Sequence, residues 1–160
     1  MHSKIFQISM EPINEYEYIC EDDYYDHWFT NQIADYVSDD CDREVTIKWL
    51  SDCLNGCNID KDQNGYYLVV SNKEEYFKRS FERFIQALGE IGIPTLDDFI
   101  KPHGVDLWHL QDAYEDKYGF YVDYASHSGY GMELMTFDYF VRMCQVNTKY
   151  YIGGVVDYHF

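Results

Sequence analysis

Residues 57–89 read CNIDKDQNGYYLVVSNKEEYFKRSFERFIQALG and decide the fold class, because they place a strand pair directly before a helix. Asn64-Gly65 is a strong signal for a two-residue hairpin turn. The apolar run 66–70 that follows it predicts a strand. A hairpin joined without a linker to a helix over 71–89 favours an α+β fold rather than a regular alternation of strands and helices.

The helix over 71–89 carries the clearest helical pattern in the chain. Ser71 and Glu74 have the spacing of a capping box, and Gly89 is a plausible stop. The apolar positions recur at helical spacing and are expected to form the central packed face: Phe77, Phe81, Phe84, Ile85 and Leu88.

The same kind of analysis assigns the other elements. Strands are expected at 4–10, 15–20, 120–124 and 150–160, the last broken at Gly153-Gly154, and helices at 23–37, 42–54, 105–118 and 135–144, with a short turn at 95–100. Thr95 and Thr136 stand where N-caps belong, and so do Asp22 and Asp23 at the start of the helix over 23–37. We therefore predict one domain over 1–160, with a small mixed or antiparallel sheet of four to five short strands packed by four to five helices.

Charge is concentrated in an acidic N-terminal segment, residues 11–44. It holds twelve carboxylates against one base, Arg43, and so carries −11 of the net charge of −17. It also contains Trp28, Phe29 and several tyrosines, which is too much apolar mass for a disordered tail. A folded acidic surface of this kind repels nucleic acid and anionic membranes and attracts basic partners.

The spacing of the acids within a helix over 23–37 suggests what such a surface does. Residues four apart on a helix are separated by about 6 Å along its axis, and Asp22/Asp26 and Asp35/Asp39 have this spacing. A DNA strand advances about 3.4 Å per phosphate along its axis. Helical carboxylates at this spacing are therefore dimensionally able to imitate a phosphate ladder.

These features predict a non-enzymatic inhibitor that binds a basic protein surface. In its concrete form it is a nucleic-acid mimic that occludes the basic cleft of a nuclease or another nucleic-acid enzyme, with aromatic side chains as anchors. The predicted partner-binding residues are Asp22, Asp23, Tyr25, Asp26, Trp28, Asp35, Tyr36, Asp39, Asp40, Asp42 and Glu44. In size, charge and aromatic content the chain resembles the small acidic DNA-mimic inhibitors, including anti-restriction and anti-CRISPR proteins.

Two other readings stay open. One is a small cytosolic accessory or adaptor domain without catalytic activity, homodimeric through its tyrosine-rich surface, in which the charges are scattered around an apolar patch. The other is an enzyme built on His109 and the loop Ser126–Gly131, which is polar and aromatic but lacks the glycine spacing of a phosphate-binding loop. The sequence does not decide whether that loop has a role.

No metal or cofactor is expected. Asp60-x-Asp62-x-Asn64-Gly65 matches the first half of an EF-hand loop, but residue 71 is Ser where calcium needs a bidentate Glu. Cys53 and Cys57 lack a second ligand pair at zinc-finger spacing.

Location is predicted from the cysteines and from apolar runs. The chain has an odd number of cysteines, five, no secretory signal pattern and no apolar run of membrane-spanning length. We expect a cytoplasmic protein with reduced thiols that contacts neither membrane nor nucleic acid directly.

Overall fold

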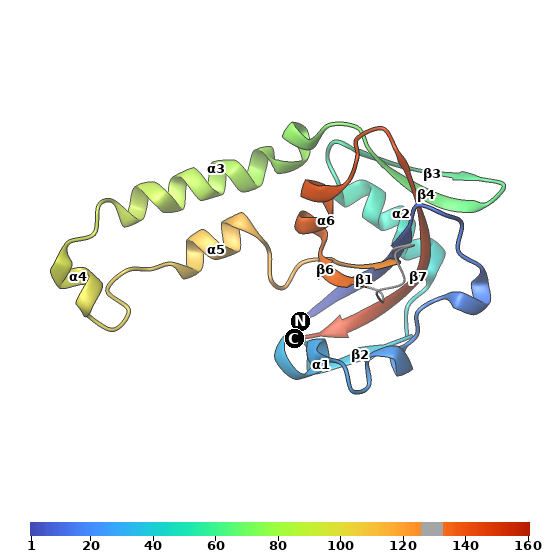
Figure 1. Cartoon of the computed structure of the whole chain (residues 1–160), viewed down its shortest axis with the longest axis horizontal. Helices are drawn as coiled ribbons and strands as arrows, with labels where there is room; N and C mark the ends of the chain where they lie inside the picture. The colour runs from blue at the N-terminus through green and yellow to red at the C-terminus, as the bar shows by residue number, and fades with distance from the viewer. Residues whose placement is uncertain (126–132) are drawn as a thin grey trace.

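The computed structural model describes residues 1–125 and 133–160 and shows one mixed sheet with helices around it (Figure 1). The strands are β1 (His2–Ser9), β2 (Tyr36–Ser38), β3 (Cys57–Asp62), β4 (Gly65–Val70), β5 (Tyr121–Ala125), β6 (Glu133–Thr136) and β7 (Lys149–His159). The helices are α1 (Trp28–Gln32), α2 (Arg43–Cys53), α3 (Lys73–Ile91), α4 (Leu96–Ile100), α5 (Trp108–Tyr114) and α6 (Phe137–Met143), with 3-10 helices η1 (Glu15–Glu17) and η2 (Glu21–Tyr24). The α+β class is confirmed, and the described residues form seven strands and six α-helices, more than predicted.

The sheet has the strand order β3-β4-β7-β1-β5-β6, and β2 pairs with the far end of β7. Only the β1–β5 pair is parallel. Along each strand, side chains alternate between the two faces of the sheet. Phe6 and Ile8 point into a core closed by α2 and α6, whereas Ile5 and Tyr158 point into a second core closed by the acidic segment. The acidic segment is therefore one layer of the fold.

A β-bulge in the central strand pair fixes how the acidic segment crosses the sheet. Phe6 pairs with Val155 and Ile8 with Ile152, so two glycines, Gly153-Gly154, lie opposite Gln7 alone. The prediction that these glycines break the last strand is wrong, because β7 runs through them.

The side chain of Gln7 uses this bulge to hold the segment. Its amide nitrogen donates to the carbonyl of Glu17 (2.9 Å), and its oxygen accepts from the amides of Gly154 (2.8 Å) and Ile19 (3.3 Å). A Cβ on Gly154 would lie 2.7 Å from the backbone nitrogen of Ile19. Glycine is therefore required for this close approach of two backbones.

The predicted strand 15–20 and helix 23–37 are both absent. Residues 15–17 form η1, and the helix is limited to α1, after which the chain turns into β2. His27 caps α1 by accepting from the amide of Phe29 (3.3 Å). The amide of Asp35 then donates to the carbonyl of His159 (2.7 Å). Pairing with the edge of β7 thus overrides the helical periodicity of this stretch.

The predicted N-caps Thr95 and Thr136 are confirmed, whereas Asp22 and Asp23 begin no helix over 23–37, because η2 (Glu21–Tyr24) stands there. The side chains of Asp42, Thr95 and Thr136 accept backbone hydrogen bonds at the starts of α2, α4 and α6. The hairpin β3–β4 is also confirmed, but its turn residues are 63–64, because Gly65 pairs with Asp62.

The longest helix, α3, is not a core helix. It is capped by Asn72 rather than by the predicted Ser71–Glu74 box, and it continues past Gly89 to Ile91. In Figure 1 it extends away from the sheet, and together with α4 and α5 it forms a projecting structure that we call the helical arm (residues 73–114). None of the helices in the described part of the chain is long and apolar enough to cross a membrane.

The expected packed face of α3 is therefore largely open. Phe81 is 62% exposed, and Ile85 and Leu88 are each about half exposed. The sheet face that α3 was expected to cover is already occupied by α2 and α6. Among the described residues of α3, Tyr76 and Phe77 near its start pack against that core. The hydroxyl of Tyr76 donates to Asp138 (2.9 Å). Farther out, α3 packs on α5.

The bulge yields a stability prediction. Gly154→Ala should lower the free energy of unfolding by about 1–3 kcal/mol, because the new methyl group overlaps the backbone of Ile19. Chemical denaturation measures this loss. The matched control is Gly89→Ala in α3, where nothing lies within 4 Å and a gain of about 0.5–1 kcal/mol is expected. Equal effects of the two substitutions would contradict the close approach.

Candidate functional site

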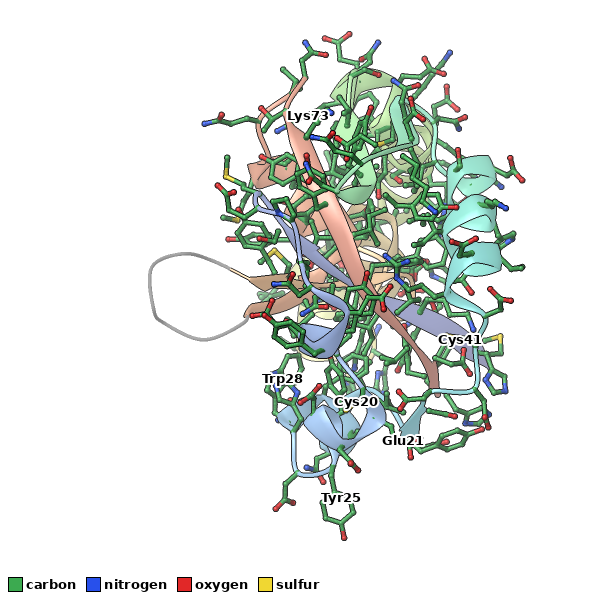
Figure 2. All side chains as sticks on the ribbon, turned by 90° about the vertical axis from the view of Figure 1, so that its right-hand side faces the viewer. Cys20, Glu21, Tyr25, Trp28, Cys41 and Lys73 are labelled. Carbon is green, nitrogen blue, oxygen red and sulfur yellow. The ribbon has the colours of Figure 1, made fainter. Side chains whose placement is uncertain are left out.

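The eleven predicted partner-binding residues, which we call the acidic surface, are all exposed. They come from η2, α1, β2, the connections between them and the start of α2. Two reciprocal hydrogen bonds join the ends of this stretch. The amide of Glu21 donates to the carboxylate of Asp39 (2.8 Å), and the amide of Asp39 donates to that of Glu21 (3.3 Å). Figure 2 shows Tyr25 pointing outward, away from the sheet.

The carboxylates do not form a helical ladder. Asp22 lies in η2 and Asp26 in the turn after it, while Asp35 and Asp39 flank the strand β2. The predicted spacing along one helix axis is therefore wrong, because it depended on a helix that the β2–β7 pairing replaces.

Five of the eight carboxylates of the acidic surface also have a role within the protein. Asp23 caps η2, Asp42 caps α2, Asp39 bonds to Glu21, and Asp35 and Glu44 pair with His159 and Lys61. The other three, Asp22, Asp26 and Asp40, have no side-chain hydrogen bond or ion pair with any described residue. Charge on these three is available to a partner.

Arg43, the only base in the segment, does not neutralise these acids. Its Nε donates to the carbonyl of Gly153 (2.5 Å) and its Nη2 to that of Ile152 (2.6 Å). Its guanidinium also lies 4.7 Å from the ring centroid of Tyr18. The guanidinium is thus used to bind backbone oxygens at the bulge, and the surface keeps its negative charge.

A buried tyrosine–aspartate pair anchors the acidic surface to the sheet. The hydroxyl of Tyr24, in η2, donates to Asp123 of β5 (2.5 Å), and both residues are buried. The second oxygen of Asp123 has no hydrogen-bond partner among the described residues. Burial raises the pKa of this carboxyl, and burial together with the neighbouring charge raises the pKa of Tyr24.

Beside the acidic surface lies a groove that the sequence did not reveal. It has a volume of about 740 Å³ and runs between α5 and the sheet. We call it the aromatic groove, and its aromatic lining comes from Trp28, Trp108, Tyr114, Tyr118, Tyr121 and Tyr139. Trp28 belongs to both the acidic surface and the groove, so the two are continuous.

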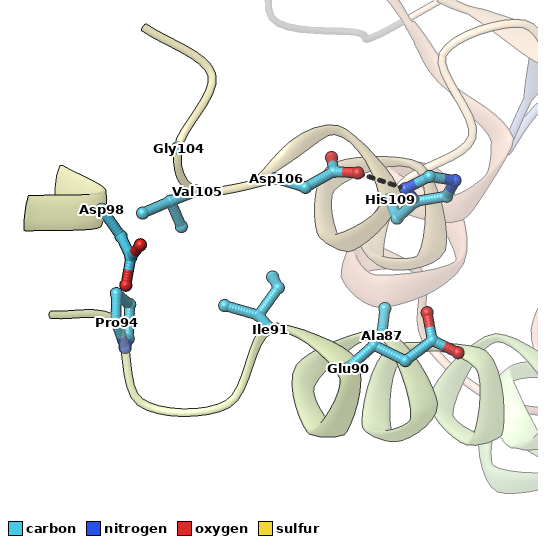
Figure 3. A pocket seen from close by; sticks show the side chains of 9 residues that line it. All are labelled: Ala87, Glu90, Ile91, Pro94, Asp98, Gly104, Val105, Asp106 and His109. Carbon is cyan, nitrogen blue, oxygen red and sulfur yellow. Dashed lines mark hydrogen bonds and ion pairs between the residues drawn. The ribbon is translucent and has the colours of Figure 1, made fainter. Parts of the chain in front are cut away.

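His109, the candidate catalytic residue if the protein were an enzyme, lines a pocket other than the aromatic groove. Its Nδ1 donates a hydrogen bond to the carboxylate of Asp106 (2.8 Å) in a pocket near the tip of the helical arm (Figure 3). The described residues that line this pocket include Glu90 and Asp98 but no Ser, Thr or Cys that would serve as a nucleophile. The loop Ser126–Gly131 falls outside the described residues.

All five cysteines are free thiols. Burial raises the pKa of Cys57 to about 12, and burial also raises the pKa of Cys41, Cys53 and Cys144. These four stay protonated at neutral pH and are poor nucleophiles and metal ligands. Among the described residues no three His, Cys, Asp or Glu side chains gather as a metal site would need. Asp62, from the EF-hand-like stretch, pairs instead with Lys149 (2.7 Å).

No protein-family model, curated protein or solved structure matches this chain. The site is therefore defined by its own geometry alone, as an ordered acidic surface continuous with an aromatic groove.

Asp123 gives a pH prediction. Its folded-state pKa is raised, so its contribution to stability is complete below the unfolded pKa of about 4 and is lost as pH rises through the folded value. Asp123→Asn keeps an oxygen that accepts from Tyr24 and has no proton to lose. From about pH 4 to about pH 8, the variant should therefore lose less unfolding free energy than the parent, as followed by urea denaturation.

The contrasting variant is Tyr24→Phe. It leaves the buried carboxyl without its donor, which should cost about 1–3 kcal/mol and should make the loss at higher pH steeper. Parallel pH profiles for the parent and both variants would contradict this role of the pair.

Proposed function

We propose that this protein is a non-enzymatic binding protein that docks its acidic surface on a basic surface of another protein. The observation that carries the proposal is the position of Arg43. The segment's only base is committed to β7 carbonyls, while all eight carboxylates of the surface remain exposed. Such a surface attracts a basic partner over a distance of about one Debye length, on the order of 10 Å.

The finer form of the proposal is an inhibitor that occupies the basic cleft of a nuclease or another nucleic-acid enzyme. Charge, exposure and the outward Tyr25 support it, since nucleic-acid clefts are rich in Lys and Arg. The mimicry of a regular phosphate ladder has no support, because the carboxylates lie in turns and beside a strand and not along one helix. We propose a cytoplasmic location, which the five free thiols support.

Charge removal tests the acidic surface. Changing Asp22, Asp26 and Asp40 to Asn removes three charges that have no described partner inside the protein, so the fold should keep its stability. Association with a basic partner should slow by on the order of tenfold at low salt and become less salt-dependent. The measurement is affinity capture from cell extract, followed by binding kinetics with each captured protein.

The matched control removes three charges from α3 instead, as Glu74→Gln, Glu75→Gln and Glu82→Gln. A true partner must be basic, must be weakened by the first triple variant and must be unaffected by the second. For the finer form, the partner must also release a labelled DNA or RNA duplex when this protein is added. Equal effects of the two triple variants on partner binding would show that the acidic surface is only a solvated face and not a binding site.

The helical arm favours a second candidate, the homodimeric adaptor. Phe81, Ile85 and Leu88 form an open stripe along α3. The helix itself carries four acids and four bases, so it is neutral in a strongly acidic chain. A second copy meets the least repulsion there, and exposed apolar stripes of this kind mark interaction surfaces.

Phe81→Ala tests this candidate. Because the ring is 62% exposed, truncation should cost less than about 1 kcal/mol of unfolding free energy rather than the about 3–5 kcal/mol of a core phenylalanine. Sedimentation should show a dimer for the parent and a monomer for the variant. Met143→Ala, which truncates an exposed side chain on α6, should remain dimeric. A monomeric parent excludes the homodimer.

A further inference from the structure

Three large rings that line the aromatic groove keep much of their surface exposed. Trp28 and Tyr139 are nearly half exposed, and Trp108 is 61% exposed. They come from α1, α6 and α5, which are distant in sequence. A monomer rarely gathers this much aromatic surface in one concavity without a ligand for it.

Other tyrosine rings of the chain lie against cationic side chains. Arg142 lies 4.3 Å from the ring centroid of Tyr114 at the edge of the groove, and Lys149 lies 4.0 Å from that of Tyr67. Lys117, which also lines the groove, lies 5.4 Å from the ring centroid of Tyr118. Among the described residues, no cation lies over Trp28, Trp108 or Tyr139. Trp is the strongest of the aromatic side chains in cation–π contacts.

Two carboxylates stand beside these rings with their positions already fixed. Asp112 holds Arg83 through one oxygen (2.5 Å), and Glu115 accepts from the hydroxyl of Thr136 through one oxygen. The second oxygen of each has no hydrogen bond with a described residue. A fixed carboxylate with a free oxygen is suited to a Lys or Arg donor, because little conformational entropy is lost when the donor binds.

We infer that the aromatic groove binds an extended segment of a partner protein through its arginine or lysine side chains. The cationic groups lie against Trp28 and Trp108, and Asp112 and Glu115 accept their hydrogen bonds. This rests on the proposed function, in that the partner is basic, and it names how the partner is gripped. The net charge of −17 favours a basic segment over a neutral or acidic one of the same shape.

The chain offers its own fluorescent reporters. It has three tryptophans, and two of them line the groove. A Trp49→Phe background therefore leaves only Trp28 and Trp108. The probe is a blocked peptide of alternating arginine and glycine, and the matched probe replaces each arginine with citrulline, which keeps the shape and removes the charge.

The expected result is a saturable fluorescence change with the arginine peptide and none with the citrulline peptide. Affinity should fall about five- to thirtyfold in Trp108→Ala and in Tyr139→Ala, which remove rings that α5 and α6 contribute to the groove. Both side chains are exposed enough for the fold to survive, which circular dichroism checks. Tyr16→Ala, an exposed aromatic outside the groove, should bind as the parent does.

The remaining outcomes overturn the inference. A fluorescence change that does not saturate with the arginine peptide would exclude the groove as a cation site. An unchanged affinity in Trp108→Ala would show that the peptide is attracted by net charge alone. An equal affinity for the citrulline peptide would show that the groove binds an uncharged ligand. The acidic-surface triple variant should keep its affinity for the peptide within about threefold. If the groove does not bind the arginine peptide but the acidic-surface triple variant still loses its basic partner, this inference is wrong and the proposed function stands.

Discussion

The buried amide of Gln7 is the contact on which the acidic surface depends. It bonds at once to β7, through Gly154, and to the acidic segment, through Glu17 and Ile19. A segment with a net charge of −11 repels itself and gains little from lying flat unless polar contacts fix it to an apolar layer. The bulge supplies the room, because neither glycine carries a side chain between the two backbones. Among the described residues, the acidic segment supplies the layer that closes the sheet face that includes Tyr158.

The open edge of β7 explains why the segment keeps its charge. Between the stretches paired with β4 and β2, this edge would present unpaired carbonyls, which natural sheets cover. Arg43 covers two of them, and the thiol of Cys41 donates to the carbonyl of Val155 (3.3 Å). A guanidinium serves here because its rigid fork reaches two oxygens together. One residue thereby protects the sheet edge and is withdrawn from the surface it would otherwise neutralise.

The sequence predicts those elements whose signals are local and misses those whose cause is a distant contact. The cap residues Thr95 and Thr136 act within their own first turns, so the starts of α4 and α6 were predictable. The acids around β2 follow helical spacing, yet the edge of β7 decides their conformation. The helical periodicity places Phe81 on the apolar face of α3, but it does not predict which element, if any, covers that face. The exposure of the eight predicted carboxylates was predictable from charge, whereas the groove required the fold to bring Trp28 near Trp108.

Charge and aromatic surface contribute different terms to the proposed binding. Screened attraction acts over about 10 Å and has little directionality, so the acidic surface by itself would speed association with many basic proteins. Selection needs contacts that are short and shaped, and buried aromatic anchors supply such contacts. Trp28 lies where the acidic surface meets the groove, so the two proposed binding regions are adjacent. In the proposed binding, the carboxylates would set how fast a basic partner arrives, and the rings would set which partner stays bound.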